Sequence, residues 1–255
     1  MAASPIDRFR LDGKVAIVTG ASSGLGVAFA TGLAAAGCDL ALGARRVERL
    51  DETRERVEAL GRACIAVPTD VASPQDCQTL VEECVERFGR VDVLVNNAGV
   101  GSAGPATREA PEDFRRVLEV NLFGAYWMAQ ACGRAMEPGS AIVNVGSIVG
   151  ERNLGVPQAA YASSKAAIVA LTRDLAAQWT GRRGIRVNAL APGVFSSEMT
   201  DQLSAETVKG LEARIPIGRL GGPEELVSAL LFLAADASSY VSGTVLTVDG
   251  GLLAA

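Results

Sequence analysis

The sequence predicts a single doubly wound α/β domain, in which helices cover both faces of a parallel β-sheet. Short apolar runs recur along the chain without polar alternation, as in strands that are buried on both faces. Amphipathic stretches of helical length separate these runs. The 255 residues are 49% hydrophobic with a net charge of −5, which suits one large core, and no repeat or Pro/Ser-rich linker divides them.

Strands and helices are expected in regular alternation. We expect strands at residues 14–19, 38–43, 63–67, 92–95, 141–145, 185–190 and 245–248. We expect helices at residues 25–36, 47–60, 75–88, 111–136, 157–179 and 223–235. Ser73 and Pro74 introduce the third helix, because serine is a good N-cap and proline suits the first turn. Residues 196–216 are polar and lack a strand pattern, so we expect a short helical insertion over a site there.

The composition excludes several classes of protein. The chain has no histidine, so neither a Ser-His-Asp triad nor a histidine-ligated metal site can form, and we expect no metal site. Its five cysteines include no C-x-x-C pair, which argues against a zinc site or disulfide framework and favours buried, reduced thiols. No Lys/Arg-dense stretch indicates a nucleic-acid binder, and no stretch approaches the length of a membrane span. We therefore expect a cytoplasmic protein that binds neither nucleic acid nor membrane.

A glycine-rich loop follows the first strand and leads directly into the first helix. Glycines let backbone N–H groups approach a pyrophosphate, and a helix N-terminus favours its negative charge. The same glycines would also serve a tight turn alone, but their place in a βαβ unit favours dinucleotide binding in a Rossmann domain. The candidate cofactor-binding residues here are Gly20, Ser22, Ser23, Gly24, Leu25 and Gly26.

The end of the second strand selects between the two nicotinamide dinucleotides. An acidic residue there would bind the ribose 2′-hydroxyl of NAD(H), whereas arginine accommodates the 2′-phosphate of NADP(H). Arg45 and Arg46 follow this strand, and the first carboxylate is Glu48. We therefore predict NADP(H) over NAD(H), with Arg45 as the main phosphate ligand and Arg46 as its neighbour. The alternative is an ordinary basic helix start, although positive charge is unfavourable at that end of a helix.

Further motifs follow the glycine loop in order along the chain. They are Asp70-Val71, Asn96-Asn97-Ala98-Gly99, Asn121, Ser147, Tyr161-Ala162-Ser163-Ser164-Lys165 and Pro192-Gly193. Together these motifs resemble the short-chain dehydrogenase/reductase family, in particular its NADP-preferring single-domain members. The resemblance implies one catalytic domain over residues 1–255, with a seven-stranded sheet in the order 3-2-1-4-5-6-7.

The resemblance assigns additional residues to the cofactor. Asp70 and Val71 would lie beside the adenine ring, and residues 192–197 would lie over the nicotinamide. The full additional set is Asp70, Val71, Asn97, Ala98, Gly99, Tyr161, Lys165, Pro192, Gly193, Phe195 and Ser197. Asn96 would support this pocket, although paired asparagines can also simply stabilise a turn at a strand end.

Tyr161 and Lys165 lie four residues apart in a helical pattern, so their side chains share one face. A tyrosine hydroxyl, with a pKa of about 10, is a poor base at neutral pH. A neighbouring ammonium and an oxidised nicotinamide would stabilise the phenolate and lower that pKa. Tyr161 can then exchange a proton with a substrate oxygen while hydride moves to or from the nicotinamide. The resemblance also places Lys165 on the nicotinamide ribose.

Ser147 and Asn121 complete the catalytic set that the resemblance implies. Ser147 would hydrogen-bond the reacting oxygen, and Asn121 would hold a water that links Lys165 to solvent. Each of the four residues also has an ordinary structural explanation: a core aromatic, a solvated helix charge, a strand-end cap or an amide that bonds the backbone. Their joint occurrence in this order favours the catalytic explanation.

These features predict an NADP(H)-dependent oxidoreductase that transfers hydride between the nicotinamide and a ketone or secondary alcohol. Similar family members act on 3-oxoacyl thioesters, sugar acids such as gluconate, or other carbonyl compounds, and the fold does not choose among them. One alternative is a catalytically idle NADP-binding regulator or assembly partner, which would not need Tyr161 and Lys165 in register. Another is an isomerase or dehydratase that keeps its nicotinamide bound.

The substrate pocket is expected between residues 100–105, 148–158 and 195–216. Ser147 and Tyr161 are fourteen positions apart, one more than the commonest family spacing, so the loop between them carries an extra residue. The candidate lining residues are Val149, Arg152, Asn153, Leu154, Val156, Gln158, Met199 and Leu203. Arg152 could pair with a substrate carboxylate or phosphate, or it could be an ordinary surface arginine.

A homotetramer is implied by the resemblance. Alanines recur along residues 157–179, and an outer stripe of small residues would let a partner helix approach closely. Residues 249–251, after the last strand, would supply a second interface. The alanines could instead pack on the sheet, which leaves the oligomeric state to experiment.

Overall fold

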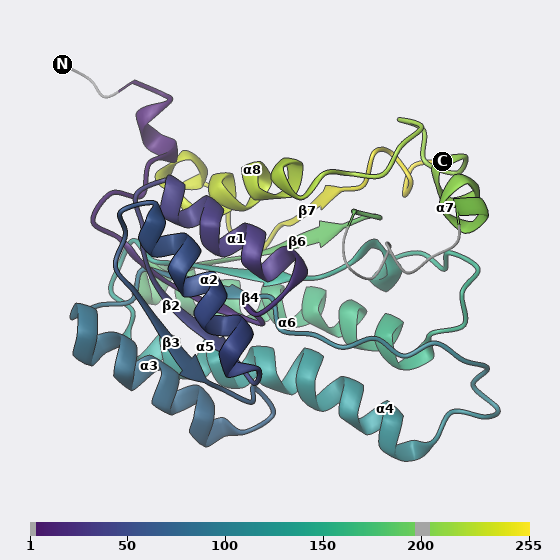
Figure 1. Cartoon of the computed structure of the whole chain (residues 1–255), viewed down its shortest axis with the longest axis horizontal. Helices are drawn as coiled ribbons and strands as arrows, with labels where there is room; N and C mark the ends of the chain where they lie inside the picture. Colours follow the sequence, from purple (N-terminus) through teal and green to yellow (C-terminus); the bar gives the residue numbers. More distant parts are fainter. Residues whose placement is uncertain (1–3, 197–204) are drawn as a thin grey trace.

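A parallel seven-stranded sheet in the order β3-β2-β1-β4-β5-β6-β7 forms the centre of the computed structural model, which describes residues 4–196 and 205–255 (Figure 1). The strands are β1 (Val15–Thr19), β2 (Asp39–Ala44), β3 (Cys64–Pro68), β4 (Val93–Asn96), β5 (Ala141–Val145), β6 (Arg186–Pro192) and β7 (Val245–Val248). The predicted fold class and strand order are confirmed. Each predicted strand boundary lies within two residues of the observed one.

Helices alternate with the strands. They are α1 (Gly24–Ala35), α2 (Val47–Ala59), α3 (Pro74–Phe88), α4 (Pro111–Leu118), α5 (Gly124–Ala135), α6 (Ala159–Arg183), α7 (Ala205–Glu212) and α8 (Pro223–Ala234). Shorter turns are the 3₁₀ helices η1 (Asp7–Phe9), η3 (Ile148–Gly150) and η4 (Asp236–Ser238) and the π-helix η2 (Glu119–Phe123). The helix expected at 111–136 is thus interrupted by η2. The helix expected at 157–179 continues to Arg183, because its stop signal is Gly184, with φ of +66°.

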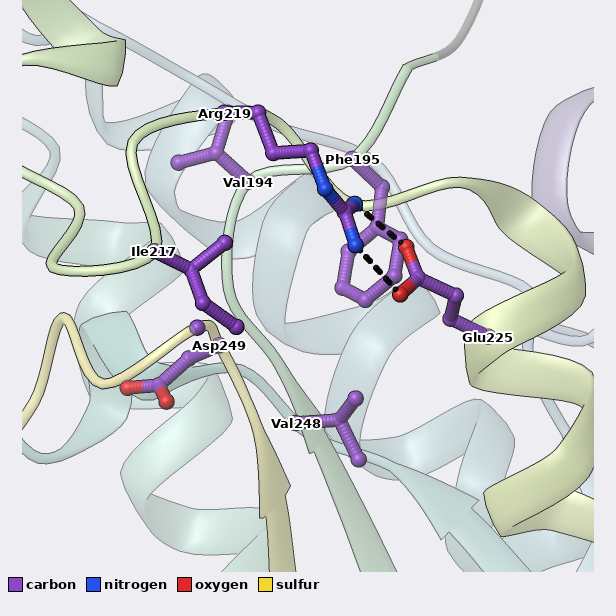
Figure 2. A pocket seen from close by; sticks show the side chains of 9 residues that line it. Val194, Phe195, Ile217, Arg219, Glu225, Val248 and Asp249 are labelled. Carbon is purple, nitrogen blue, oxygen red and sulfur yellow. Dashed lines mark hydrogen bonds and ion pairs between the residues drawn. The ribbon is translucent and has the colours of Figure 1, made fainter.

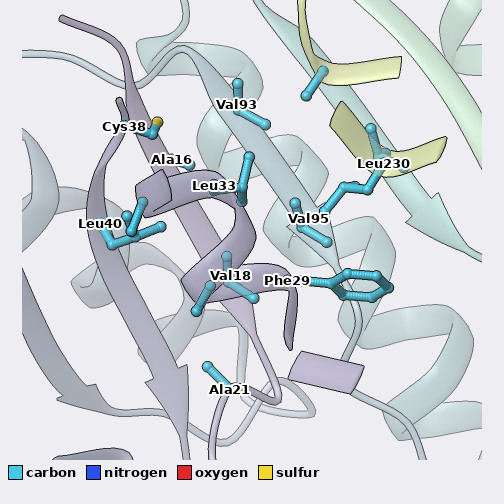
Figure 3. Packing of buried hydrophobic residues seen from close by; sticks show 14 of the residues in the cluster. Ala16, Val18, Ala21, Phe29, Leu33, Cys38, Leu40, Val93, Val95 and Leu230 are labelled. Carbon is cyan, nitrogen blue, oxygen red and sulfur yellow. The ribbon is translucent and has the colours of Figure 1, made fainter. Parts of the chain in front are cut away.

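Helices cover both faces of the sheet (Figure 1). Alternate residues of β1 point to opposite faces, so Ala16 and Val18 pack with α1, α2 and α8, whereas Val15 and Ile17 pack with α3, α5 and α6. Figure 3 shows the first of these clusters, in which Phe29 and Leu33 of α1 meet β4 and Leu230 of α8. This double cover explains why the central strands have no polar alternation.

The two outer strands are less buried than their apolar sequences suggest. In β3 the first three residues are half-buried, and in β7 all four residues are. Among the described residues, both strands lie at the edges of the sheet and lack a neighbouring strand on one side. The apolar surface of β7 is therefore available to a further chain.

The cysteines are free, as predicted, and four of the five are buried. Cys64 is half-buried because it lies on the edge strand β3, which corrects the expectation that all five are buried. Burial raises the pKa of the Cys64, Cys77 and Cys84 thiols to about 12, so these groups remain protonated at neutral pH. Within the described residues, no helix has the length and apolar character needed to cross a membrane.

Candidate active site

The glycine loop joins β1 to α1 at the carboxyl edge of the sheet. Gly20 and Gly24 have φ of +66° and +54°, a conformation that favours glycine. A Cβ on Gly26 would lie 2.1 Å from the carbonyl oxygen of Gly20, so only glycine permits this close approach. Within the described residues, α1 has neither a side-chain cap nor an acidic residue in its first turn. Its first N–H groups are therefore left for an anion, and the loop fits the pyrophosphate of a dinucleotide.

Asn97 and Thr19 hold the glycine loop in place from β4 and β1. The Thr19 hydroxyl accepts hydrogen bonds of 3.1 Å from the N–H groups of Asn97 and Ala98. The Asn97 side chain donates to the carbonyl oxygens of Thr19, at 3.0 Å, and Gly20, at 3.2 Å. Asn97 thus supports the glycine loop through hydrogen bonds to its main chain. Ala98 lies directly against the loop, since a Cβ on Gly20 would be 2.8 Å from its Cα.

The two arginines after β2 differ in their surroundings. Arg46 donates to the hydroxyls of Ser22, at 3.2 Å, and Ser23, at 2.6 Å, and therefore lies on the glycine loop. Arg45 is exposed beside it. Arg45 was predicted to be the main phosphate ligand, whereas in the structure it is Arg46 that contacts two of the other predicted cofactor residues, Ser22 and Ser23. Both hydrogen bonds come from the same guanidinium nitrogen, Nη2.

Asp70 and Val71 lie in the turn between β3 and α3. The Asp70 carboxylate accepts a 3.1 Å hydrogen bond from the Ala72 N–H and so stabilises its own turn. Val71 is buried, and a Cβ on Gly124 would lie 2.7 Å from its side chain. The turn is therefore packed on the start of α5. Its contact with an adenine ring, expected from the resemblance, stays a prediction.

Tyr161 and Lys165 lie on the first turns of α6, as their spacing predicted. The Lys165 ammonium nitrogen is 5.6 Å from the centre of the Tyr161 ring. It donates a 2.7 Å hydrogen bond to the carbonyl oxygen of Val145, the last residue of β5. Only 5% of Lys165 is exposed, and this burial lowers the pKa of its ammonium to about 8. The lysine is thus held at the site by one carbonyl, without a carboxylate partner among the hydrogen bonds of the described residues.

Ser147 follows β5 and faces Tyr161. Its hydroxyl accepts a 3.2 Å hydrogen bond from the Val149 N–H, which caps η3 and fixes the side chain. Burial raises the pKa of Tyr161, and the Ser147 hydroxyl opposes part of that rise by stabilising the phenolate. Without a nucleotide, Tyr161 is therefore protonated at neutral pH. This state suits a group that donates a proton to a substrate oxygen.

Asn121 lies inside the π-helix η2, a feature that is frequent at functional sites. Its side-chain oxygen accepts from the Val100 N–H at 2.8 Å, and its amide donates to the Val100 carbonyl at 2.9 Å and to the Ser164 hydroxyl at 3.0 Å. These contacts tie the loop after β4 to α6. The water-holding role expected from the resemblance stays a prediction, since the amide is occupied by protein groups.

Gly99 lies beside two of the candidate catalytic residues, Asn121 and Lys165. A Cβ on Gly99 would lie 3.3 Å from the Asn121 side-chain oxygen and 3.7 Å from the Lys165 nitrogen. The absence of a side chain therefore leaves space beside both groups. Sequence reasoning did not anticipate the anchoring roles of Val100, Val145 and Ser164, two of which act through main-chain atoms and carry no side-chain signal.

Residues 193–196 follow Pro192, the last residue of β6, and their place over a nicotinamide stays a prediction. Pro192 is buried, and a Cβ on Gly193 would lie 2.6 Å from the Asp249 Cα. The Phe195 ring is buried against Gly221 and lines a cavity of about 130 Å³, beside the ion pair of Arg219 and Glu225 (Figure 2). The Phe195 ring thus supports this loop from the side of α8. The predicted residues Ser197, Met199 and Leu203 lie outside the described residues.

The loop between Ser147 and Tyr161 departs from expectation at Arg152. Its guanidinium donates to main-chain oxygens of residues 252, 253 and 255. Arg152 is exposed, but its Nη1 is tied to the C-terminal residues, so it is not a free surface arginine. The contact spans about a hundred positions of sequence, so no local pattern could have indicated it.

Comparison with known proteins agrees with this geometry. A family model described as enoyl-(acyl carrier protein) reductase matches residues 20–253. This range includes the glycine loop and the four candidate catalytic residues. The chain belongs to the short-chain dehydrogenase/reductase family.

Relatives in this family are similar over nearly their whole length. The 2-dehydro-3-deoxy-D-gluconate 5-dehydrogenase of Escherichia coli (strain K12) is 38% identical over 254 residues, which cover 98% of this chain and 99% of the relative. The 3-oxoacyl-(acyl-carrier-protein) reductase of Thermotoga maritima is 40% identical over 247 residues, which cover 96% and 99%. A gluconate 5-dehydrogenase from Burkholderia cenocepacia J2315, solved with NADP and tartrate, has a TM-score of 0.92 at 37% identity and covers 99% and 100%.

This short-chain dehydrogenase/reductase is an NAD(P)-dependent oxidoreductase that acts on hydroxyl or carbonyl groups. The predicted family, fold and class of reaction are therefore confirmed. The glycine loop, Gly99 and the first turns of α6 lie next to one another at the carboxyl edge of the sheet.

Proposed function

We propose that the protein is an NADP(H)-dependent oxidoreductase that interconverts a ketone and a secondary alcohol, with Tyr161 as the proton donor and acceptor. One observation carries the proposal: Tyr161 faces the Ser147 hydroxyl and lies 5.6 Å from the Lys165 ammonium, at the edge where the glycine loop ends. Bound NADP(H) would supply or accept the hydride. The sugar-acid and 3-oxoacyl activities of relatives support a carbonyl or alcohol substrate of one of these kinds.

The chain's own residues divide the remaining work of reduction. Tyr161 donates its proton to the substrate oxygen, and Ser147 donates a hydrogen bond that orients the same oxygen. The Lys165 ammonium stabilises the phenolate that is left behind, because an adjacent positive charge favours the ionised form. Asn121 fixes the loop around Gly99 through Val100 and keeps space beside Lys165.

The experiment that tests this function is a turnover screen with NADPH and with NADH. The panel contains acetoacetyl-CoA as a 3-oxoacyl thioester, 5-keto-D-gluconate as a sugar acid and diacetyl as a neutral ketone. We expect oxidation of NADPH with at least one of them, at a rate about tenfold or more above that with NADH. Tight NADPH binding without turnover would instead support an idle binding protein.

Cofactor selection is expected to depend on the arginines beside the glycine loop. Arg45→Asp and Arg46→Asp should each weaken NADPH binding by roughly 10- to 100-fold, because each removes a charge-assisted phosphate contact. For Arg45→Asp, NADH binding should stay within about 2-fold, since NADH has no 2′-phosphate. Arg46→Asp also removes the hydrogen bonds to Ser22 and Ser23 of the glycine loop, so it should weaken NADH binding as well, but less than NADPH binding. Fluorescence titration with both nucleotides measures these changes.

The matched control for charge is Arg54→Asp on α2, whose partners are Asp51 and Glu58 rather than the glycine loop. It introduces the same change in net charge and should leave both affinities nearly unchanged. Equal affinity of the unmodified protein for NADH and NADPH would contradict the proposed preference.

We also propose a homotetramer. The alanines of α6 differ in their burial: Ala160 is buried, whereas Ala159, Ala166 and Ala170 are exposed. The exposed alanines form the small-residue surface that a partner helix could approach closely. The half-exposed edge strand β7 supports a second interface. Light scattering should give the mass of four 26.3 kDa chains, and the mass of one chain would contradict the proposal.

A further inference from the structure

The loop of residues 148–158 is tied to the C-terminal segment, which we define as residues 249–255. The Arg152 guanidinium donates to the main-chain oxygens of Leu252, at 3.1 Å, and Leu253, at 3.3 Å, and it also bonds the main-chain oxygen of Ala255. All three acceptors belong to one turn of chain. Arg152 therefore links two segments that lie about a hundred positions apart in the sequence.

A second arginine holds the same loop from another segment. Arg214, which follows α7, donates a 2.7 Å hydrogen bond to the carbonyl oxygen of Leu154. Beneath the two arginines is a small apolar cluster whose buried members are Ile148, Leu154, Ile215 and Leu252. The cluster is separate from the two large clusters on the faces of the sheet. Three segments thus share one local core.

Hydrogen bonds and packing hold the C-terminal segment in place. The Asp249 carboxylate accepts from the N–H groups of Gly251, at 2.9 Å, and Leu253, at 2.6 Å. Pro216 packs on the turn, since a Cβ on Gly251 would lie 3.2 Å from its ring. The main-chain oxygens that Arg152 contacts are therefore presented by a fixed turn.

The loop in turn touches the catalytic residues directly. A Cβ on Gly150 would lie 2.7 Å from the Lys165 carbonyl carbon and from the Ala166 nitrogen, so the loop packs tightly on α6. Val149 donates to the Ser147 hydroxyl. Partly buried Val194, from the loop after β6, also packs on the apolar cluster. The start of the loop, residues 148–150, is therefore held beside Ser147 and Lys165 by contacts that do not involve Arg152.

We propose that Arg152 is a positioning residue, which sets the shape of the substrate pocket by holding its wall loop against the C-terminal segment. The assignment of this loop to the substrate pocket rests on the proposed function. All three hydrogen bonds of Arg152 come from one guanidinium nitrogen, Nη1, and go to the C-terminal segment, so Arg152 acts through the position of the loop. Its removal changes how well a substrate fits, while the glycine loop that holds the dinucleotide is untouched.

Hydrogen exchange of the protein tests the link between Arg152 and the C-terminal segment without any substrate. Three variants are compared with the unmodified chain: Arg152→Ala, removal of residues 252–255, and both changes together. Amides in residues 148–158 should exchange roughly tenfold faster or more in either single variant. The double variant should add little to the truncation alone, because the truncation already removes every acceptor of Arg152, together with Leu252 of the apolar cluster. Arg87→Ala on α3, where the guanidinium lies over Phe88, is the control and should leave this loop unchanged. Unchanged exchange of the loop in Arg152→Ala would overturn the proposal.

Kinetics with the most active compound of the panel give a second measurement. Arg152→Ala should raise KM by about 3- to 10-fold, with kcat and the NADPH dissociation constant within about 2-fold. Arg152→Lys should recover part of the loss, because an ammonium can still donate to one of the carbonyls. The rise in KM could instead be confined to 5-keto-D-gluconate and add to the effect of the truncation. That result would show that Arg152 binds the substrate carboxylate and would overturn its role as a positioning residue. Absence of turnover in the unmodified protein would contradict the proposed function, while the exchange measurement would still decide the role of Arg152.

Discussion

Replacement of Tyr161 by phenylalanine is expected to lower kcat by about 10²- to 10⁴-fold, the usual contribution of a positioned acid or base. Only the hydroxyl is lost, and the ring keeps its place beside Lys165. The substrate oxygen then has no proton donor, although Ser147 can still orient it. NADPH affinity should stay within about 2-fold, because the glycine loop and the arginines are unchanged. Steady-state rates and a fluorescence titration on the same preparation measure both quantities.

The matched control for this change is Tyr240→Phe. Tyr240 is fully exposed after η4, so the loss of its hydroxyl should affect neither turnover nor binding. Full turnover by Tyr161→Phe would remove Tyr161 from the reaction. Loss of NADPH binding would show that the phenol is needed to build the cofactor site instead.

Replacement of Lys165 by methionine is expected to abolish most activity and yet to stabilise the protein at pH 7. Burial lowers the pKa of Lys165 from 10.5 to about 8, so the native state holds the charged lysine at a cost on the order of 3 kcal/mol. Loss of the hydrogen bond to Val145 offsets about 1 kcal/mol of this gain. The remainder corresponds to a melting temperature that is higher by roughly 4–8 °C.

The stabilisation of the fold by Lys165→Met depends on pH. Below about pH 8, lysine is charged in both the folded and unfolded states, so the cost is fully present. Between about 8 and 10.5 the folded protein releases the proton first, and the cost disappears as pH rises. The difference in melting temperature between Lys165→Met and the unmodified protein should therefore shrink from pH 7 to pH 10.

Thermal unfolding at those two pH values, at fixed protein concentration, checks this prediction. Lys209→Met, at an exposed position of α7, is the control and should change the melting temperature little at either pH. A lower melting temperature for Lys165→Met at pH 7 would show that the buried lysine stabilises the fold. Retention of normal turnover would show that Lys165 is not part of the catalytic set.

The fold could be predicted from sequence because its signals are local. Central strands such as β1 and β5 are continuous apolar runs, since helices cover both of their faces. The outer strands β3 and β7 have the same apolar character, and only the sheet order shows that they are half-exposed. The π-helix at 119–123 was missed, because one wider turn leaves the apolar pattern of the surrounding helix almost unchanged.

The candidate site likewise combines local features, which the sequence shows, with contacts between distant positions, which it does not. The spacing of Tyr161 and Lys165 and the glycine pattern of residues 20–26 are local, and the structure brings both sets to one edge of the sheet. The contacts of Arg152 with the C-terminal segment, of Arg46 with Ser22 and Ser23, and of Asn121 with Val100 join distant positions. Such contacts depend on how the chain folds back on itself, so residue type and spacing alone did not indicate them.

The most direct test of the central claim is to follow hydride itself. NADPH deuterated at C4 of the nicotinamide is incubated with the protein and the most active carbonyl compound of the panel, and the product is analysed by mass spectrometry. We expect an alcohol that carries deuterium on the former carbonyl carbon, formed at least about a hundredfold more slowly by Tyr161→Phe. A product without deuterium would indicate an isomerase or dehydratase and would contradict the proposed oxidoreductase, as would the absence of any product with all three classes of carbonyl compound.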